Sequence, residues 1–203
     1  MSSSEAPRFL FIAGMPRSAN NVIVAALDGH PDILVWPTEL HYFIFFEQVA
    51  RGRARVPLAE INEVALAHFG EYLNRKLVHG SGEDHPTYAH GDVLGDFDSS
   101  VFIKRMADGA PDEVEPQGYL RHLFECLKAA HRQYRDRKVK YYAINCMARG
   151  MDWEDDRLFE SSRVLFPNRP PMECYASLRE RHLRKQSPNV FFAPSAKKGA
   201  LYW

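Results

Sequence analysis

The segment FIAGMPRSANNVIVAALDGHPDI, residues 11–33, decides which fold class we expect for this chain of 203 residues. The apolar run Phe9–Ala13 predicts a short buried strand, and the apolar side chains of Val22–Leu27 recur at helical spacing. A tight turn, Gly14–Ser18, joins the two. The first turn of a helix presents unpaired N–H groups, so a strand–turn–helix unit of this kind is a place where proteins hold anions. The turn is therefore our first candidate for a binding site.

Composition places the chain among globular proteins and excludes several function classes. Hydrophobic residues make up 45% and charged residues 26% of the sequence, which is ordinary for a domain with a sizeable core. The 26 basic and 26 acidic residues balance, which argues against a broad surface for nucleic acid. We find no apolar stretch of membrane-spanning length and no secretory signal, and three widely spaced cysteines fit a reducing compartment. We therefore expect a cytoplasmic protein with no nucleic-acid partner and no membrane span.

Beyond the first helix, strands and helices are expected to alternate. Gly29 is a suitable stop for that helix, Ile33–Trp36 predicts a second strand, and Thr38 is an acceptable N-cap for a following helix. Further strands are predicted at 139–146 and 163–168, and further helices at 58–77, 120–134 and 169–185, whereas 101–106 fits a strand or a helix start. This alternation predicts an α/β fold with a mostly parallel central sheet and helices on its faces.

We interpret residues 1–203 as a single three-layer domain of this class. Residues 1–7 are expected to form a disordered N-terminus, and 186–203 a C-terminal tail. Residues 80–98 are rich in Gly, Asp and His and are interpreted as a loop, a candidate lid that orders when substrate binds.

The turn after the first strand does not fit a conventional ATPase, GTPase or nucleotide kinase. The phosphate-binding loop of those enzymes reads G-x-x-x-x-G-K-[ST], but here Gly14 is followed five positions later by Ala19, and the lysine is missing. What remains is Arg17, whose planar guanidinium suits a phosphate or a sulfate because it bonds two oxygens at once. The alternative interpretation is a plain strand-to-helix turn that exposes an arginine.

A second motif occupies the last third of the chain, in VLFPNRPPMECYASLRER. Arg169 follows a predicted strand, and Ser177 stands about two turns into the next predicted helix. A loop arginine and a serine near the start of a helix can bracket a single anion. The alternative is that both are ordinary surface residues.

Taken together, the two motifs resemble those of the sulfotransferase family that uses 3′-phosphoadenosine 5′-phosphosulfate (PAPS). That family has a first motif similar to G-x-P-R-S-G-T-T, then a helix and "HP", and this chain has GMPRSANNVIVAALDGHPDI. Its second motif is an apolar strand, an arginine, seven residues and a serine, which Arg169 and Ser177 match. The resemblance spans most of residues 8–184 and is closest to the branch that includes the tyrosylprotein sulfotransferases. It implies the sulfotransferase version of the P-loop nucleotide-hydrolase fold.

The resemblance also implies roles for individual residues. Arg17 would stabilise charge on the leaving phosphate, and Arg169 and Ser177 would bind the 3′-phosphate that distinguishes PAPS from ATP. The residues implied to cradle the 5′-phosphosulfate are Gly14, Pro16, Arg17, Ser18, Ala19, Asn20 and Asn21. No metal is required, because the arginine and the loop amides supply the positive field. The product would be 3′,5′-adenosine bisphosphate.

The general base is expected shortly after the HP segment. Glu39 matches the position of an acidic base in the tyrosylprotein branch, and a carboxylate in an apolar segment has a raised pKa. His41 is the competing base, since other branches of the family use histidine. The alternative for Glu39 is a first-turn helix residue favoured by the macrodipole.

The chain departs from the family in two respects. SANN replaces SGTT, so Ala19 puts a methyl group where a glycine allows close approach, and a positive φ there would cost energy. Asn20 and Asn21 tolerate such backbone and can donate through their amides. The sequence also continues only briefly past the second motif, where Lys197 and Lys198 are candidates for a phosphate contact. In the loop of residues 80–98, Asp84, His85, His90 and Asp92 are a candidate metal cluster.

We therefore expect transfer of a sulfuryl group from PAPS to a hydroxyl or amine on a small-molecule, carbohydrate or peptide acceptor. The alternative is a degenerate member of the family that binds a nucleotide or anion without turnover and acts as a regulatory or assembly protein. The sequence does not distinguish between acceptors, and it leaves the oligomeric state open.

Overall fold

The computed structural model describes residues 6–14, 19–40, 42–67, 97–108, 112–147, 162–170 and 172–177. Its elements are β1 (Arg8–Gly14), α1 (Asn20–Leu27), β2 (Ile33–Glu39), α2 (Tyr42–Ala50), β3 (Val56–Pro57), α5 (Ser99–Ala107), β4 (Glu113–Val114), α6 (Pro116–Ala130), β5 (Tyr141–Met147) and β6 (Ser162–Leu165). Residues 58–67 and 172–177 are also helical.

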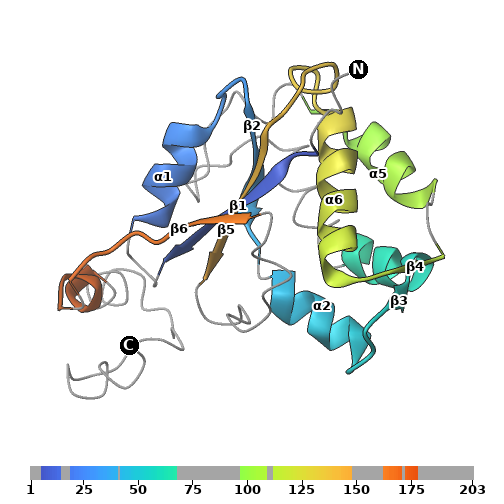
Figure 1. Ribbon diagram of the computed structural model, residues 1–203, viewed down its shortest axis with the longest axis horizontal. Coiled ribbons are helices and arrows are strands. Elements are labelled where there is room, and N and C mark those ends of the chain that lie inside the picture. The colour runs from blue at the N-terminus through green and yellow to red at the C-terminus, as the bar shows by residue number, and fades with distance from the viewer. Residues whose placement is uncertain are drawn as a thin grey trace.

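A parallel sheet forms the centre of the molecule, as predicted. Its strand order is β2-β5-β1-β6, and β1 pairs in parallel with β5 over Arg8–Gly14 and with β6 over Phe9–Ile12. Across this strand order, the chain moves in one direction from β1 to β2 and in the opposite direction from β2 to β5. Because parallel crossovers are right-handed, this reversal places the connecting helices on opposite faces. Figure 1 shows α1 on one face of the sheet and α5 and α6 on the other.

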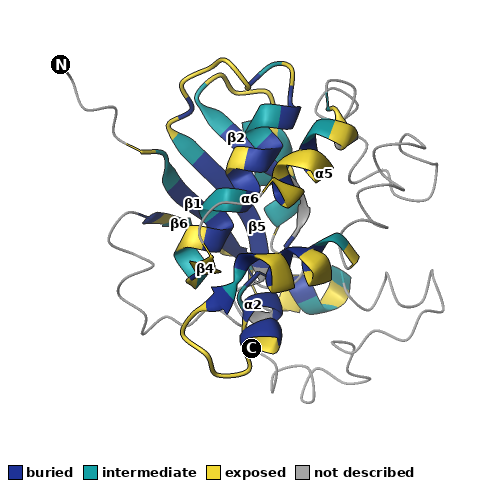
Figure 2. Ribbon diagram, turned by 90° about the vertical axis from the view of Figure 1, so that its right-hand side faces the viewer, coloured by how far each residue is buried: buried dark blue, intermediate teal, exposed yellow. Residues whose placement is uncertain are grey.

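The central strands are buried because both of their faces are covered. Phe9, Phe11 and Ala13 of β1 point toward the main core on the α6 side, while Leu10 points toward α1. A strand covered on both faces reads as a continuous apolar run, which is what the sequence of β1 shows. Figure 2 shows the central strands β1 and β5 as largely buried.

Aromatic side chains hold α6 against the sheet. The ring of Phe124 on α6 stacks on Tyr142 of β5, with 4.7 Å between centroids and 8° between planes. It also meets the edge of Trp36 on β2 at 5.7 Å. All three side chains are almost completely buried. Aromatic pairs at these distances add to the large apolar area that each ring buries.

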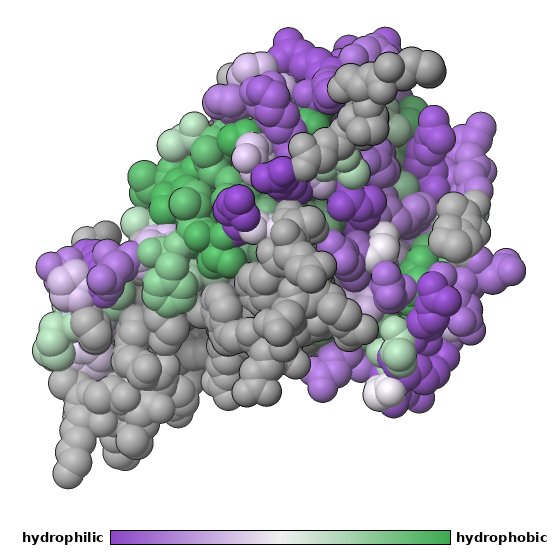
Figure 3. Space-filling model, viewed as in Figure 1, coloured by the Kyte–Doolittle hydropathy of each residue, from purple (hydrophilic) through white to green (hydrophobic). Residues whose placement is uncertain are grey.

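The opposite face of the sheet, which α1 covers, is packed less extensively. Val24 and Leu27 of α1 pack against Leu10, Val35 and Ala143 of the sheet. No residue of α1 is fully buried, and Val22 is 68% exposed. Figure 3 shows hydrophobic side chains gathered at the surface over α1.

The predicted second helix is present, but its predicted start at Thr38 is wrong. Thr38 and Glu39 belong to β2, which pairs with β5 again at Glu39–Asn145 after a shift in register, and α2 begins at Tyr42. The backbone N–H of Leu40 still donates to the carbonyl of Asn145 at 2.9 Å. Pro37 does not stop the strand because β2 lies at the edge of the sheet, where a proline removes no ladder bond that the sheet needs.

Other boundaries also differ from the prediction. Residues 101–106 are helical and belong to α5, whose N-cap is Asp98: its carboxylate accepts from the N–H groups of Ser100 and Val101. α6 starts four residues earlier than predicted, with Pro116 in its first turn, and ends at Ala130, before Tyr134. The small antiparallel pair β3–β4 was not predicted, because two-residue strands carry no periodic signal.

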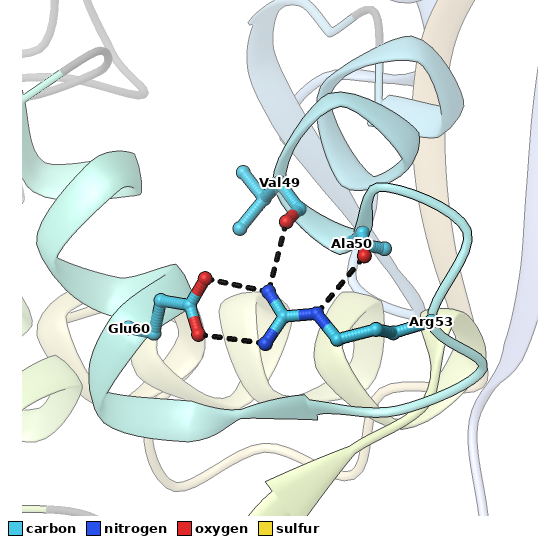
Figure 4. Close-up of polar contacts among 4 residues, drawn as sticks. All are labelled: Val49, Ala50, Arg53 and Glu60. Carbon is cyan, nitrogen blue, oxygen red and sulfur yellow. Dashed lines mark hydrogen bonds and ion pairs between the residues drawn. The ribbon is translucent and has the colours of Figure 1, made fainter.

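Arg53 joins the end of α2 to the next helix (Figure 4). Its Nε and Nη2 donate at 3.0 Å to the carbonyl oxygens of Ala50 and Val49, the orphan acceptors at the end of α2. The same guanidinium bonds both carboxylate oxygens of Glu60, at 3.0 and 2.6 Å. Hydrogen bonding to Arg53 lowers the pKa of Glu60. Gly52 follows α2 with a φ of 82°, a left-handed conformation that suits glycine.

Several predictions concern residues outside the described parts of the chain. These are residues 1–5 of the N-terminus, 80–96 of the candidate lid, 68–77 and 178–185 of two predicted helices, and the tail at 186–203 with Lys197 and Lys198. The weak metal candidates Asp84, His85, His90 and Asp92 lie outside them too. Within the described residues, no helix combines the length and apolar character needed to cross a bilayer.

Replacing Phe124 should test the aromatic core. We expect Phe124→Ala to lower the free energy of unfolding by about 3–5 kcal/mol, since it leaves a cavity between α6 and the sheet. The control is Phe166→Ala, because Phe166 is 54% exposed and its loss should change stability by about 0.5 kcal/mol or less. Denaturant unfolding of both variants measures the difference, and equal effects would contradict the observed packing.

Candidate functional site

The carboxyl ends of the four parallel strands lie along one edge of the sheet. These ends are Gly14 of β1, Glu39 of β2, Met147 of β5 and Leu165 of β6. The first motif leaves the sheet at Gly14, and the second motif follows Leu165 on the neighbouring strand. Two segments about 150 residues apart in sequence therefore start from adjacent positions at the same edge.

The same edge contains a point where the chain reverses direction across the sheet. After β1 the chain passes to β2, beyond β5, and after β5 it passes to β6, beyond β1. The next strand therefore lies in opposite directions across the sheet for β1 and for β5. In open α/β sheets, ligands bind in the crevice beside such a switch point, outside the carboxyl ends of the strands. Gly14 and Met147, which are register partners, mark this place.

Ala19 has a left-handed backbone, the conformation that the sequence analysis describes as costly for a residue other than glycine. Its φ is 72° and ψ is 20°, and it is the N-cap of α1 without a side chain that can cap. Its carbonyl accepts from the N–H groups of Val22 and Ile23 at 2.9 and 3.3 Å. A residue with a Cβ pays roughly 1–2 kcal/mol for this conformation, which glycine adopts freely.

Asn20 and Asn21 make contacts within the protein. The Asn20 Nδ2 group lies 3.5 Å from the carbonyl of Gly14, so it spans the turn between β1 and α1. The Oδ1 of Asn21 accepts from Nδ2 of Asn145 at 2.9 Å. The two asparagines thus fasten the start of α1 to the ends of β1 and β5, and Asn21 keeps an Nδ2 donor that Asn145 does not use.

Asn145 is a site residue that the sequence analysis missed. It is 2% exposed near the end of β5, and its backbone carbonyl also accepts from the N–H of Leu40. Within the described part of the chain, its Oδ1 is buried without a hydrogen-bond partner. A lone asparagine in the otherwise apolar strand YYAINCM was the available signal, because a buried polar residue in a strand needs a partner.

Arg169 and Ser177 lie in one short unit after β6. Glu173 and Cys174 donate through their N–H groups to the carbonyl of Pro170 at 2.9 and 3.2 Å, which starts the helical turn of residues 172–177. The Cys174 side chain is fully buried and its thiol lies 3.8 Å from the Arg169 carbonyl. The buried thiol anchors the turn, while the Arg169 side chain stays 39% exposed.

Glu173 is a second residue that the sequence analysis did not single out. Its Oε2 accepts from Nε of Arg169 at 3.0 Å, in an ion pair whose side chains are 39% and 57% exposed. A guanidinium has five N–H donors, and this pair uses one of them. The four-residue spacing between Arg169 and Glu173 was the available signal.

The structure describes only part of the predicted catalytic set. The backbone of Glu39 lies at the carboxyl end of β2, opposite Asn145 of β5. Pro16, Arg17, Ser18 and His41 lie outside the described residues. Glu39 and His41 are therefore both kept as predicted bases.

The described residues offer no exposed thiol and no ready metal centre. Cys126, Cys146 and Cys174 are all buried thiols. Burial raises the pKa of Cys126 to about 12, so its thiol stays protonated near neutral pH. Among the side chains that the structure describes, no group of three or more His, Cys, Asp or Glu could hold a metal ion.

Comparison with known proteins gives no relative for this chain. No family model matches the sequence, and neither a curated protein nor a solved structure matches it significantly. The proposed function therefore depends on the motifs of this chain and on the geometry of the sheet edge.

Replacing Ala19 should reveal the strain at the start of α1. We expect Ala19→Gly to raise the free energy of unfolding by about 0.5–1 kcal/mol, because relief of the left-handed strain outweighs the entropy that glycine loses on folding. Ala26→Gly, at an exposed position inside the same helix, is the matched control and should lower stability by about 1 kcal/mol. A loss of stability in Ala19→Gly would contradict the strain.

The amide pair between α1 and β5 can be measured by a double-mutant cycle. Asn21→Ala and Asn145→Ala should show a coupling free energy of about 0.5–1.5 kcal/mol in denaturant unfolding, because each substitution removes the same hydrogen bond. If the two single changes in unfolding free energy sum to that of the double variant within about 0.3 kcal/mol, the pair does not join the two elements.

Proposed function

We propose that this protein is a PAPS-dependent sulfotransferase with the sulfotransferase version of the P-loop fold. The observation that carries the proposal is the adjacency of β1 and β6, from which the two motifs leave at the same edge of the sheet. A donor with a 5′-phosphosulfate and a 3′-phosphate needs two anion sites at a separation that one nucleotide spans. Two motif-bearing segments at one switch point provide such an arrangement.

The donor would lie with its two charged ends on different strands. The turn after β1 and the start of α1 would hold the 5′-phosphosulfate through backbone N–H groups and the Arg17 guanidinium. Arg169 and Ser177, after β6, would bind the 3′-phosphate. Such a site would discriminate between PAPS and ATP by the 3′-phosphate rather than by the adenine.

The reaction would be an in-line transfer of the sulfuryl group. The acceptor oxygen or nitrogen attacks sulfur, the bond from sulfur to the bridging oxygen breaks, and 3′,5′-adenosine bisphosphate leaves. Arg17 would stabilise the charge that develops on the leaving phosphate, in place of a metal. Glu39 or His41 would take the proton that the acceptor loses. The carboxyl end of β2, where the backbone of Glu39 lies, is at the same edge of the sheet as the motifs.

A second candidate function is anion binding without turnover. The left-handed Ala19 favours it, because a methyl group stands where the family has glycine and limits how closely a donor can approach. Transfer of labelled sulfate from PAPS to an acceptor would exclude this alternative.

Calorimetric binding of 3′,5′-adenosine bisphosphate, beside AMP and ATP and without magnesium, tests the proposed donor site. We expect the bisphosphate to bind more tightly than AMP, because only it presents a 3′-phosphate to Arg169. Arg169→Ala should weaken its binding by about ten- to hundredfold, the value of a charge-assisted hydrogen bond, and leave AMP unchanged.

The matched control is Arg135→Ala, which removes an exposed arginine paired with Asp136 in the turn after α6. It should bind the bisphosphate as the wild type does. Equal affinity of the wild type for the bisphosphate and AMP would contradict a 3′-phosphate site, and with it the proposed donor.

A further inference from the structure

Glu173 lies between the two residues proposed to bind the 3′-phosphate. It follows Arg169 by four residues and precedes Ser177 by four. In the helical turn of residues 172–177, side chains four apart lie on the same face, so Glu173 and Ser177 are neighbours there. Glu173 also contacts Arg169 directly, with 3.0 Å between Oε2 and Nε. A ligand that bridges Arg169 and Ser177 must therefore come close to this carboxylate.

A phosphate and the Glu173 carboxylate have similar requirements. Both are anions that accept hydrogen bonds from a guanidinium, and a phosphate does so with more charge and more oxygens. If the phosphate binds while the carboxylate stays in place, the two negative charges repel each other. If the carboxylate turns away, the ion pair with Arg169 is lost. Glu173 opposes binding of a phosphate in either case.

The ion pair is weak enough for a ligand to displace it. Both side chains are substantially exposed, and solvent-exposed pairs contribute little to stability because water and salt screen them. The backbone beneath the pair is held independently, by the hydrogen bonds to Pro170 and the buried Cys174 side chain. Opening the pair therefore moves two side chains and need not disturb the turn.

From these contacts we infer that Glu173 is an internal competitor for Arg169 that sets the affinity and selectivity of the site for the 3′-phosphate. This inference rests on the proposed donor site. In the free protein the carboxylate holds Arg169, and a ligand with a 3′-phosphate replaces it. A nucleotide without that phosphate leaves the pair closed and is unaffected by Glu173. Glu173 is thus a selectivity residue that acts through Arg169.

Calorimetry with 3′,5′-adenosine bisphosphate and AMP tests this role in Glu173→Gln. We expect the variant to bind the bisphosphate about three- to tenfold more tightly than the wild type, because the competing charge is gone and the shape is kept. Binding of AMP should not change, and the gain should vanish in the Arg169→Ala background. Glu173→Asp, which keeps the charge, should bind the bisphosphate within about twofold of the wild type.

The control variant is Glu63→Gln, which removes one negative charge from an exposed position in helical residues 58–67. That helix lies on the side of the molecule with α6, away from β6 (Figure 1). Glu63→Gln should leave the affinity for the bisphosphate unchanged. If it raised that affinity as much as Glu173→Gln does, the effect would come from net charge alone, and the inference would be overturned.

The remaining outcomes separate this inference from the proposed function. If the wild type prefers the bisphosphate over AMP but Glu173→Gln binds it no more tightly, Glu173 does not compete for Arg169, and only this inference fails. If neither protein prefers the bisphosphate, the 3′-phosphate site itself is absent, and both fail.

Discussion

The parallel pairing of β1 with β5 on one side and β6 on the other is the constraint on which the rest of the structure depends. It places β1 inside the sheet, where side chains from α6 and α1 cover its two faces, and it aligns the carboxyl ends of neighbouring strands at one edge. The chain crosses the sheet in one direction from β1 to β2 and in the other from β2 to β5, which places α1 and α6 on opposite faces. The end of β1 thereby lies at the switch point, beside the end of β6. The proposed function needs this juxtaposition.

The start of α1 is built differently from what its position in the family motif would require. Ala19 carries the strain of a left-handed backbone, and the Asn21–Asn145 and Asn20–Gly14 contacts tie the helix to two strands. These bonds fix the start of α1 against the ends of β1 and β5. The start of α1 therefore combines a local cost in free energy with tertiary contacts that offset it, a combination common at functional sites.

Sequence reasoning predicts most of this fold because its signals are strong where the elements are amphipathic or wholly apolar. β1, β5 and the body of α6 follow directly from periodicity and burial. The prediction fails at Thr38 because a register shift and pairing with β5 extend an edge strand past a residue that caps helices well in isolation. The sequence analysis named the cost of a positive φ at Ala19, and the structure has that conformation there. The roles of Asn145 and Glu173 were not foreseen, because one depends on a contact 124 residues away and the other on a side-chain pair that only a folded turn creates.

Hydrogen exchange with and without saturating 3′,5′-adenosine bisphosphate would test most directly whether the ligand binds at this edge of the sheet. The account predicts slower exchange at residues 14–21 and 166–177 in the same complex, with residues 58–67 and α6 unchanged. AMP should protect only the first of these segments. Protection confined to other parts of the chain, or none at either motif, would contradict a site that joins β1 and β6.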